Sequence, residues 1–459
     1  MDSPLLSSRT ETCGASESPT IITVPPPLDP SESRIVPVKK SFKCCTRSDQ
    51  QQYSSIYKVP AYITKLNSKA YQPQVVSLGP YHHDKGELQP MEEHKLHARR
   101  HFVTRSRKTD GPFLESLREV AQDLKESYQA LDQNWKEDTE DQFLNLMITD
   151  GCFMLEIMRT TVGEKRDYAP KNPIFNIYSR KYRTRDIRRD MLMLENQLPM
   201  LVLYRLFAVE NNGKERDEYE YINRLILRFY SLDPGNKEMG RCLHVLDVLR
   251  KGLLMEPKEV QPDLENEESL AGEEIIQSAT ELEPWIRFKK SKTSSLKDVS
   301  FARGVLRLPV ITVDDTTQSM FLNLMTFERL HVRAGNEITS YVTFMDNIID
   351  DERDVELLQA QGIIQNAVRS NEVVAKLFNS LCKEVPLEST RRLDIVQKNI
   401  NEYRQQPWNI GRATLKRWGA NLNRTYFRSP WSTLSVGAAI FLFVLTIIQT
   451  VYVVLTYYY

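Results

Sequence analysis

The sequence has no surplus of charge of either sign, because 61 lysine and arginine residues balance 61 aspartate and glutamate residues. This balance gives no reason to expect a nucleic-acid or strongly acidic partner. Cysteine is also scarce, with six irregularly spaced residues in 459 and no C-x-x-C. We therefore expect reduced thiols and no disulfide framework. The hydrophobic fraction of 41% and the charged fraction of 27% are typical of a globular protein.

Known catalytic and targeting motifs are missing as well. The sequence contains no G-x-S-x-G, P-loop, G-x-G-x-x-G or kinase signature, and "GNKEMG" resembles a phosphate loop only superficially. The first residues, "MDSPLLSSRTETCG", lack the basic and apolar regions of a signal peptide. Cys152 is interpreted as a small core residue, while Cys44 and Cys45 are predicted to be free thiols, with acylation as the alternative. We predict no catalytic and no cofactor-binding residue from motifs.

Composition divides the chain into three parts and predicts a mainly α fold. Residues 1–52 are rich in Ser, Pro and Thr and are predicted to be a disordered tail. Residues 53–428 carry mostly helical patterns and are predicted to form one large helical domain with a small β-hairpin. Within it, 256–283 holds ten acidic residues and one basic residue, which indicates a solvated linker or loop.

A few local signals refine this prediction. The run from Phe143 to Met158 is apolar on most sides and predicts a buried helix, and 74–81 is the only early strand candidate. The second half of the basic stretch 287–307 predicts a hairpin with its turn at Arg303-Gly304 and an edge strand marked by Pro309. The role of this stretch stays open, although the acidic segment before it argues against nucleic acid. Two helix caps are expected, one at Asp314 or Asp315 and one at Ser370 or Asn371.

The C-terminal segment predicts a transmembrane helix and therefore a lipid bilayer as partner. Residues 434–455 carry no charge, and no Asp or Glu follows Glu402. A helix of this length reaches roughly 33 Å, enough for a hydrocarbon core of ~30 Å. Trp431 on one side and Tyr457 on the other stand where an interfacial aromatic belt belongs. The alternative, a buried core helix, fits poorly with a segment that has no polar stripe.

The residues before this segment are basic and amphipathic. Five basic residues occur without an intervening acidic one: Arg412, Lys416, Arg417, Arg424 and Arg428. An apolar stripe runs along the same helix: Leu415, Trp418, Leu422 and Tyr426. The stripe either lies on anionic headgroups or packs on the protein core. The positive charges predict a single-pass, tail-anchored topology with the N-terminal domain in the cytosol, at the plasma membrane or an endomembrane.

Histidines form the most conspicuous candidate for a metal site. Five of the seven are clustered in sequence: His82, His83, His94, His97 and His101. The last three share one helix face, which could hold a metal, but the pattern is not H-E-x-x-H. Arginines 99 and 100 also lie beside the candidate ligands. We therefore predict a polar helix face and no metal.

The stretch "RDMLMLENQLPMLVLYRLF", residues 189–207, places Glu195, Asn196 and Gln197 inside an apolar run. Such side chains must be hydrogen-bonded in a core or take part in chemistry. Pro199 predicts a helix kink, where the three polar side chains would satisfy the freed backbone groups. The alternative is an acid/base site, for which two carboxylate pairs are available: Asp150 with Glu156 and Asp190 with Glu195.

Longer segments resemble one plant family. They are "IYKVPAYITKLNSKAYQPQVVSLGPYHHDKGELQPMEEHK", "ITDGCFMLEI", "RDMLMLENQLPMLVL", "TSYVTFMDNII" and "RSPWSTLSVGAAIFLFVLTIIQTVY". In this order they resemble the plant family catalogued as domain of unknown function 247. The resemblance implies a large, mainly helical cytosolic domain with a C-terminal transmembrane helix and no defined activity. Some grass members are associated with self-incompatibility recognition. The chain departs from the family at Pro284-Trp285-Ile286, where a Gly-Val or Gly-Ile is usual.

Together these observations predict a membrane-anchored interaction or recognition module that binds an unknown protein partner. The alternative is an enzyme whose active site leaves no linear motif in the helical domain. Convergent polar groups in a pocket would favour the enzyme, and a broad exposed apolar patch would favour the interaction module.

Overall fold

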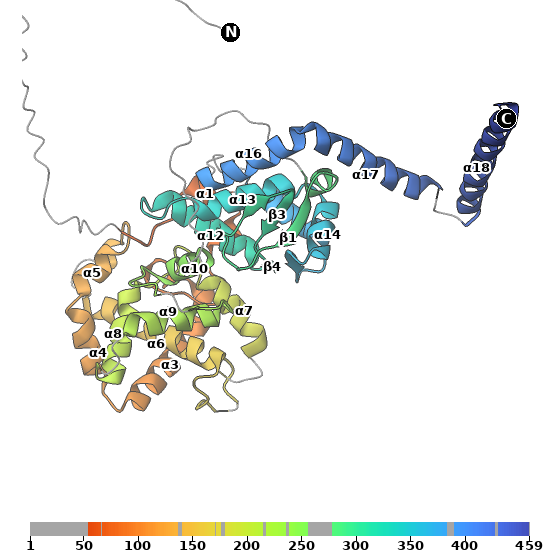
Figure 1. The fold of residues 1–459 in the computed structure, drawn as a ribbon. Coiled ribbons are helices and arrows are strands. Elements are labelled where there is room, and N and C mark those ends of the chain that lie inside the picture. Colours follow the sequence, from red (N-terminus) through yellow and green to blue (C-terminus); the bar gives the residue numbers. More distant parts are fainter. Residues whose placement is uncertain are drawn as a thin grey trace, which may run out of the picture. The chain divides into compact units, whose positions relative to one another are not determined.

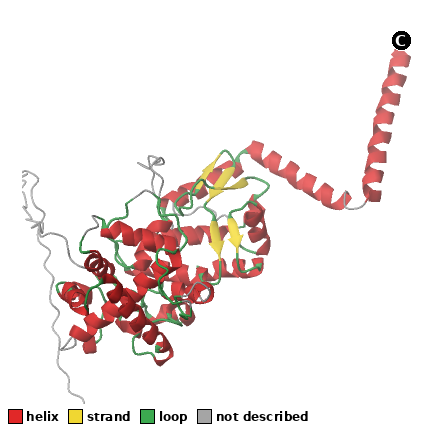
Figure 2. Cartoon of the chain, turned by 90° about the horizontal axis from the view of Figure 1, so that it is seen from below, coloured by secondary structure: helices red, strands yellow, loops and turns green. Residues whose placement is uncertain are grey.

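The computed structural model describes most of the chain from Ser54 onward. The described residues are 54–65, 67–135, 140–169, 171–175, 180–213, 217–235, 238–255, 278–382, 390–426 and 430–458. The tail predicted over 1–52 and most of the acidic segment, 256–277, lie outside them. The described residues are mainly helical with small sheets, as predicted (Figure 2).

The described part of residues 54–406 is called the helical body, and its N-terminal half, up to Met255, contains helices of 3 to 23 residues (Figure 1). They are α1 (Ala61–Thr64), α2 (Ser68–Tyr71), η1 (Pro80–His82), η2 (Gly86–Leu88), α3 (Pro90–Ser106), α4 (Asp110–Arg118), α5 (Ala121–Glu126), η3 (Gln133–Trp135), α6 (Glu140–Val162), α7 (Arg180–Asp190), α8 (Met200–Asn211), α9 (Glu218–Phe229) and α10 (Val245–Leu253). Helix α6 packs against α3, α4, α8 and α9. Its residues from Phe143 to Thr160 are almost all buried, which confirms the helix predicted from all-round apolarity.

The C-terminal half combines helices with five short strands. They are α11 (Ala279–Leu282), β1 (Arg287–Lys290), β2 (Ser300–Ala302), β3 (Val305–Leu308), β4 (Ile311–Val313), α12 (Thr317–Leu330), α13 (Glu337–Ile348), α14 (Glu352–Ala360), β5 (Ile364–Asn366), α15 (Asn371–Leu381), α16 (Arg391–Gln405), α17 (Pro407–Tyr426) and α18 (Pro430–Tyr458). The predicted hairpin is present as β2 and β3, which pair antiparallel with Phe301 opposite Leu306. Arg303 and Gly304 at its turn both have positive φ, as a two-residue type I′ connection requires.

The sheets are larger than the single hairpin predicted. Strand β1 pairs parallel with β3, so β3 is the central strand of three, and β4 pairs parallel with β5. The prediction that Pro309 marks an edge strand is wrong, because Pro309 follows the central strand β3 and belongs to no strand. Parallel partners were missed because a crossover connection leaves no turn signature in the sequence.

Caps and tethers hold the ends of several elements. The Ser370 side chain accepts the Val373 N–H and caps α15, as predicted. The predicted cap of α12 at Asp314 or Asp315 is wrong, because Thr316 is the N-cap, without a side-chain hydrogen bond, and Asp314 accepts the Thr316 N–H from two residues earlier. The last residues of the predicted acidic linker are also packed: the Asp354 carboxylate accepts the Ser278 hydroxyl and the Thr280 N–H. Residues 278–283 of the predicted linker or loop are therefore part of the fold.

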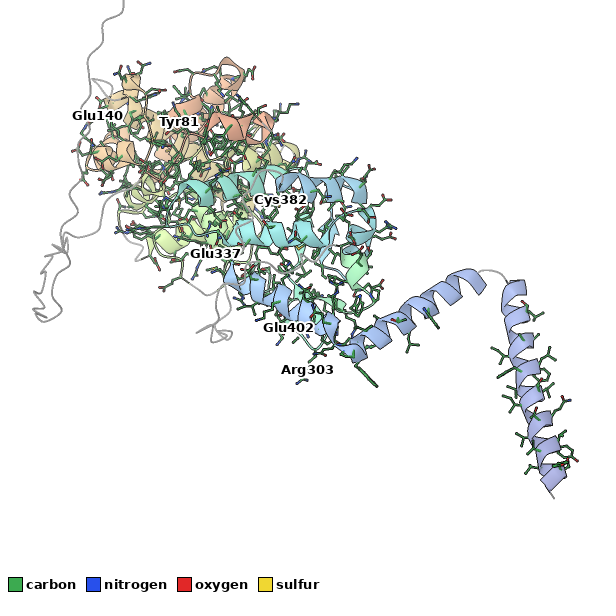
Figure 3. All side chains as sticks on the ribbon, turned by 90° about the horizontal axis from the view of Figure 1, so that it is seen from above. Tyr81, Glu140, Arg303, Glu337, Cys382 and Glu402 are labelled. Carbon is green, nitrogen blue, oxygen red and sulfur yellow. The ribbon has the colours of Figure 1, made fainter. Side chains whose placement is uncertain are left out.

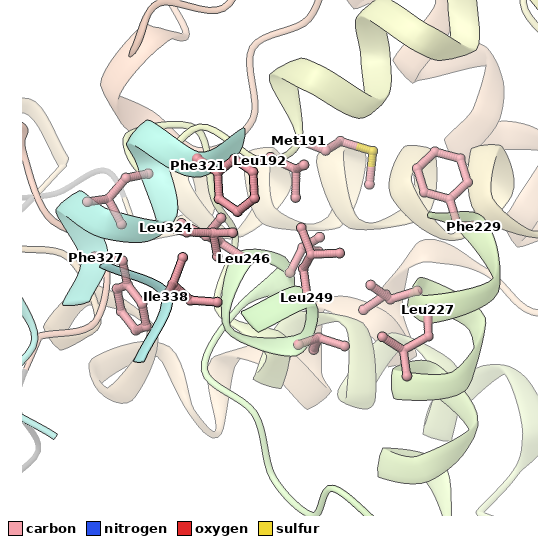
Figure 4. Packing of buried hydrophobic residues seen from close by; sticks show 14 of the residues in the cluster. Met191, Leu192, Leu227, Phe229, Leu246, Leu249, Phe321, Leu324, Phe327 and Ile338 are labelled. Carbon is pink, nitrogen blue, oxygen red and sulfur yellow. The ribbon is translucent and has the colours of Figure 1, made fainter. Parts of the chain in front are cut away.

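One continuous core joins the two halves. In Figure 4, Phe321, Leu324 and Phe327 of α12 lie beside leucines of α10, and residues of α9 and of the segment after α7 complete the cluster. The labelled residues of this cluster are Met191, Leu192, Leu227, Phe229, Leu246, Leu249, Phe321, Leu324, Phe327 and Ile338. All of them are 5% exposed or less, so the core fixes α10 and α12 on one another.

The segment 189–207 is not the kinked helix that its apolar pattern predicts. Helix α7 ends at Asp190 and α8 begins at Met200, with Pro199 as the residue before the first turn at φ −55° and ψ 131°. The nine residues between the two helices form a buried connection. Pro199 biases Leu198 away from the α region, which is consistent with a non-helical chain directly before α8.

Candidate functional site

Residues 74–79 form no strand or helix, and side chains from other parts of the chain accept their backbone N–H groups. Asp190, at the end of α7, is fully buried. Its Oδ2 accepts backbone N–H groups at 3.0 Å from Gln74, 2.6 Å from Val75 and 3.0 Å from Val76. The strand predicted over 74–81 is therefore absent: Gln74 and Val75 lie in bends, and η1 begins at Pro80. Three successive N–H groups converge on one carboxylate oxygen, whereas successive residues of a strand alternate in direction.

Asn196 continues this pairing from the α7–α8 connection. Its Oδ1 accepts the Leu78 N–H at 2.7 Å, and its Nδ2 donates to the Val76 carbonyl at 3.0 Å and the Asp190 carbonyl at 2.9 Å. The side-chain amide uses both its donor and its acceptor side, as a peptide group in a sheet does. Asn196 thus binds the segment and its own connection at once.

A buried ion pair completes the hold on the segment. Lys95 of α3 donates to Asp150 Oδ1 at 2.6 Å and to the Ser77 carbonyl at 2.8 Å. Asp150 of α6 accepts the Gly79 N–H through Oδ2 at 2.8 Å. Burial lowers the pKa of Lys95, but the carboxylates of Asp150 and Glu92 outweigh it and raise the pKa above its ordinary value. Lys95 is therefore a buried cation with its charge balanced.

Gln197 binds the connection to its neighbours. Its Nε2 donates to the carbonyls of Met191 and Met193 at 2.7 and 2.8 Å, and its Oε1 accepts the Leu246 N–H at 3.2 Å. Five polar residues thus bind one another or the backbone in this region: Lys95, Asp150, Asp190, Asn196 and Gln197. All five side chains are buried.

Glu195 lies at the edge of this region. Its Oε1 accepts the Val59 N–H at 2.7 Å, and its Oε2 is 3.2 Å from His82 Nε2. The side chain keeps 18% of its surface exposed. The three adjacent polar residues of the connection therefore point to three different parts of the chain, and each has hydrogen-bonding partners there.

A second buried cluster lies further along α6, and the sequence analysis named its Glu156 but not the partners of that carboxylate. The Glu156 carboxylate accepts both Arg105 Nη atoms and the Tyr168 hydroxyl, the last at 2.7 Å. Burial alone would raise the pKa of Glu156, but hydrogen bonds from His101 and Arg105 lower it to about 2. One turn later, Arg159 donates two hydrogen bonds to Glu210 at 3.0 and 2.7 Å. Glu156 and Arg159 at i and i+3 on an apolar helix were the available signal.

The two carboxylate pairs considered as acid/base sites do not work as pairs. Asp150 binds Lys95 and Gly79, whereas Glu156 binds Arg105 and Tyr168. Asp190 binds the N–H groups of 74–76, and Glu195 binds the N–H of Val59. Each carboxylate is occupied by groups of the fold itself, so this geometry supplies no free acid or base.

The clustered histidines have different neighbours, except that His97 and His101 share one. His82 lies beside Glu195, His83 makes an edge contact with Trp135, and His101 stacks on Tyr168 with ring centroids 4.0 Å apart. His97 makes a tilted contact with the same Tyr168 ring. Among the residues that the structure describes, no group of three or more His, Cys, Asp or Glu side chains is arranged to hold a metal ion.

Helix α18 contains the one candidate membrane span of the described residues, Gly437–Tyr457. None of its 21 residues is buried, and side chains as large as Phe441 and Phe443 are about two-thirds exposed. The alternative of a core helix therefore finds no support. Among the predicted flanking residues, Tyr457 is exposed near the end of α18, and Trp431 lies in its first turn. Arg424 belongs to α17, and Arg428 falls outside the described residues.

Comparison with known proteins gives a family but no activity. A family described as "Plant protein of unknown function" matches residues 56–445. The chain is similar to UPF0481 protein At3g47200 of Arabidopsis thaliana, with 30% identity over 433 residues, 88% of this chain and 86% of the relative. It is also similar to putative UPF0481 protein At3g02645 of the same plant, with 23% identity over 494 residues, 86% of this chain and 89% of the relative. No solved structure matches.

Proposed function

The chain belongs to the plant family catalogued as domain of unknown function 247, and on that basis we propose that it is a membrane-tethered interaction protein. In this proposal α18 anchors the chain in a bilayer, and the helical body presents a binding surface to a protein partner on the cytosolic side. The membrane is the plasma membrane or an endomembrane.

The exposed apolar surface of α18 carries the proposal. A helix of 21 uncharged residues has no stable place in water unless another protein surface or a lipid phase covers it. Its length of roughly 32 Å at 1.5 Å per residue matches the ~30 Å of a hydrocarbon core. Because all backbone N–H and C=O groups inside such a helix bind one another, the helix can cross lipid without unsatisfied groups.

The distribution of charge supports the proposed orientation. Five basic residues precede α18: Arg412, Lys416, Arg417, Arg424 and Arg428. Lysine and arginine near a span favour the cytosolic side. The helical body therefore belongs with these residues in the cytosol.

The use of the buried carboxylates favours an interaction protein over an enzyme. Asp190, Asp150 and Asp354 accept backbone N–H groups of other segments, and Glu156 and Glu328 accept arginine. Perturbed carboxylates at a catalytic site keep one side accessible to a substrate. Those five side chains are 0 to 7% exposed and serve the fold.

Alkaline carbonate extraction of membranes that contain the full chain tests the anchoring. We expect the chain to stay in the membrane pellet, and a variant with Phe443→Arg and Leu445→Arg to be released, because a charge at the bilayer centre costs ~2.5–3.5 kcal/mol on insertion scales. The matched control, Phe443→Leu with Leu445→Phe, keeps the apolar character and should remain in the pellet. Release of the unchanged chain would refute the anchoring.

Proximity labelling tests the interaction. A biotin ligase fused to the N-terminus of the full chain is compared with the same ligase fused to residues 407–459 alone, in the tissue that expresses the protein. We expect proteins that only the full chain labels, since the helical body is the proposed binding surface. Identical labelling by both fusions would contradict an interaction through the body.

A further inference from the structure

We propose that α17 lies flat on an anionic membrane surface, with one face among the lipid headgroups, so that the chain contacts the bilayer through an interfacial helix as well as through α18. The proposal rests on the anchoring by α18 proposed above. It answers a question that the sequence leaves open, because the stripe Leu415–Tyr426 is compatible with either a membrane or a protein core.

The described apolar side chains on one side of α17 do not pack on the protein. Leu415 is 71% exposed, Trp418 is 67% exposed and Trp408 is 86% exposed. At 100° per residue these three positions fall within an arc of roughly 80°, so they form one continuous face. Tryptophan is the residue that favours the lipid headgroup region, because its ring is apolar and its N–H is a donor.

A different face of the same helix contacts the protein. Asn409 and Ala413 are buried, and Asn409 Nδ2 donates to the Tyr403 carbonyl at 2.8 Å and to Gln406 Oε1 at 3.1 Å. Positions 409 and 413 lie on a line that is rotated by roughly 100–140° from position 408. The first turns of α17 are therefore fixed to the end of α16 while the tryptophan face stays open.

Basic side chains border the open face. Arg412 and Lys416 are exposed and lie between the apolar arc and the line of Asn409 and Ala413. From this position long basic side chains reach phosphate groups while their neighbours enter the headgroup layer. Glu402 on α16 is the last acidic residue of the chain (Figure 3), so no carboxylate after it repels an anionic surface. This charge pattern fits anionic lipid better than a second copy of α17, which would bring like charges together.

Chain connectivity keeps α17 close to the bilayer. Four Cα steps join Tyr426 to Pro430, the first residue of α18, and span at most ~15 Å. The interfacial layers add ~5–8 Å on each side of the hydrocarbon core. Once α18 crosses the membrane, the end of α17 is therefore held near the headgroups. A helix of 20 residues that stood upright there would expose its tryptophan face to water along its whole length.

Fluorescence quenching by brominated lipids tests the contact. The full chain with Trp431→Phe is reconstituted, one molecule per nanodisc, in brominated phosphatidylcholine with or without brominated phosphatidylserine. We expect quenching in the anionic discs that disappears on Trp408→Phe with Trp418→Phe. Arg412→Glu with Lys416→Glu should weaken the quenching in the anionic discs. The apparent affinity of the helix for anionic lipid should fall at least roughly tenfold. The matched control, Lys69→Glu with Arg100→Glu, changes the same charge at exposed positions elsewhere and should have no effect.

The possible results separate the anchoring by α18 from the contact of α17 with the membrane surface. If the chain resists carbonate but its tryptophans are not quenched in any disc, α17 does not lie on the membrane while the anchoring stands. Equal quenching in neutral and anionic discs refutes the preference for anionic lipid. If the tryptophans are shielded from solvent only when two molecules share a disc, the face binds a second copy, and the proposal is refuted. If the chain is extracted by carbonate, the anchoring itself fails.

Discussion

Lys95 and Asp150 face each other inside the helical body, with Lys95 Nζ 2.6 Å from Asp150 Oδ1 and neither side chain exposed to solvent. The pair joins α3 to α6, and both residues also bind the backbone of 77–79. The two charged side chains therefore help to fix residues 77–79, and replacing them tests how much they contribute to stability.

Lys95→Met should lower the free energy of unfolding by ~3–5 kcal/mol, because it leaves a charged carboxylate buried without its partner. Lys95→Met combined with Asp150→Asn should recover part of that loss, since the asparagine still accepts the Gly79 N–H and carries no charge. Denaturant unfolding of the full chain in detergent, arranged as a double-mutant cycle, measures the coupling. Additive losses in the double variant would show that the two charges act independently.

Asn196→Ala should destabilise the fold by ~1–3 kcal/mol, because the Leu78 N–H and two carbonyls lose their buried partner. Glu195→Ala should also destabilise it, but less, since Glu195 is partly exposed. Glu115→Ala, an exposed surface change on α4, is the control and should stay within ~0.5 kcal/mol. Melting curves of both variants that match the parent chain would remove the structural interpretation of this motif.

Gly79→Ala tests how tightly the segment is enclosed. Gly79 has φ +71°, and a Cβ there would lie 2.8 Å from the Tyr128 hydroxyl and 2.9 Å from the Gln197 carbonyl. We expect a loss of roughly 2 kcal/mol or more in the free energy of unfolding, because strain and overpacking add. Gly86→Ala, where a Cβ would meet nothing within 4 Å, is the matched control. A similar small effect at both glycines would contradict the close packing around Gly79.

His244 predicts a specific dependence of stability on pH. Burial lowers its pKa to about 4, and the neutral ring accepts the Asp247 N–H through Nδ1 while Nε2 lies 3.1 Å from the Ser55 carbonyl. The unfolded chain takes up the proton first, so the contribution of His244 is complete above pH ~6.5 and is lost as the pH falls towards 4. The loss reaches ~3 kcal/mol.

Chemical unfolding of the full chain at several pH values between about 7.5 and 4.5 measures this effect. His244→Asn keeps an acceptor at the start of α10 but does not titrate, so its stability should fall less steeply over the same range. Parallel curves for the parent and the variant would show that His244 does not cause the dependence.

The proposed topology predicts where glycosylation tags are modified. A tag after Tyr459 should be glycosylated and a tag at the N-terminus should not, because the basic residues before α18 favour the cytosolic side. The sequon Asn423-Arg424-Thr425 should also remain unmodified. Gel-shift analysis before and after deglycosylation reads out each tag. Modification of the N-terminal tag alone would reverse the orientation and place the helical body outside the cytosol.

Local patterns were sufficient to predict several elements. Helix α6 followed from its all-round apolarity, the β2–β3 hairpin from Arg303-Gly304 and the cap of α15 from Ser370. Each of these depends on residues that are near one another in sequence, where the pattern contains the physical cause.

Long-range pairings were beyond local patterns. The polar residues of 189–207 were expected to satisfy the backbone of their own kinked helix, whereas Asp190 and Asn196 bind 74–78, more than 110 positions earlier. The sequence showed that these side chains needed partners, and burial without partners is costly. It contained no information on which of many free backbone groups they would bind.

The separation in sequence between residues 74–78 and their partners has a consequence for biosynthesis. Gln74 precedes Asp190 by 116 residues, so a ribosome that adds 5–20 residues each second makes the segment roughly 6–23 s before its carboxylate partner. During that time the backbone N–H groups of residues 74, 75, 76 and 78 lack their native acceptors, Asp190 and Asn196. The N-terminal helices therefore cannot complete their native packing as they leave the ribosome. The burial of residues 74–79 must wait until α7 and the connection after it have been synthesised.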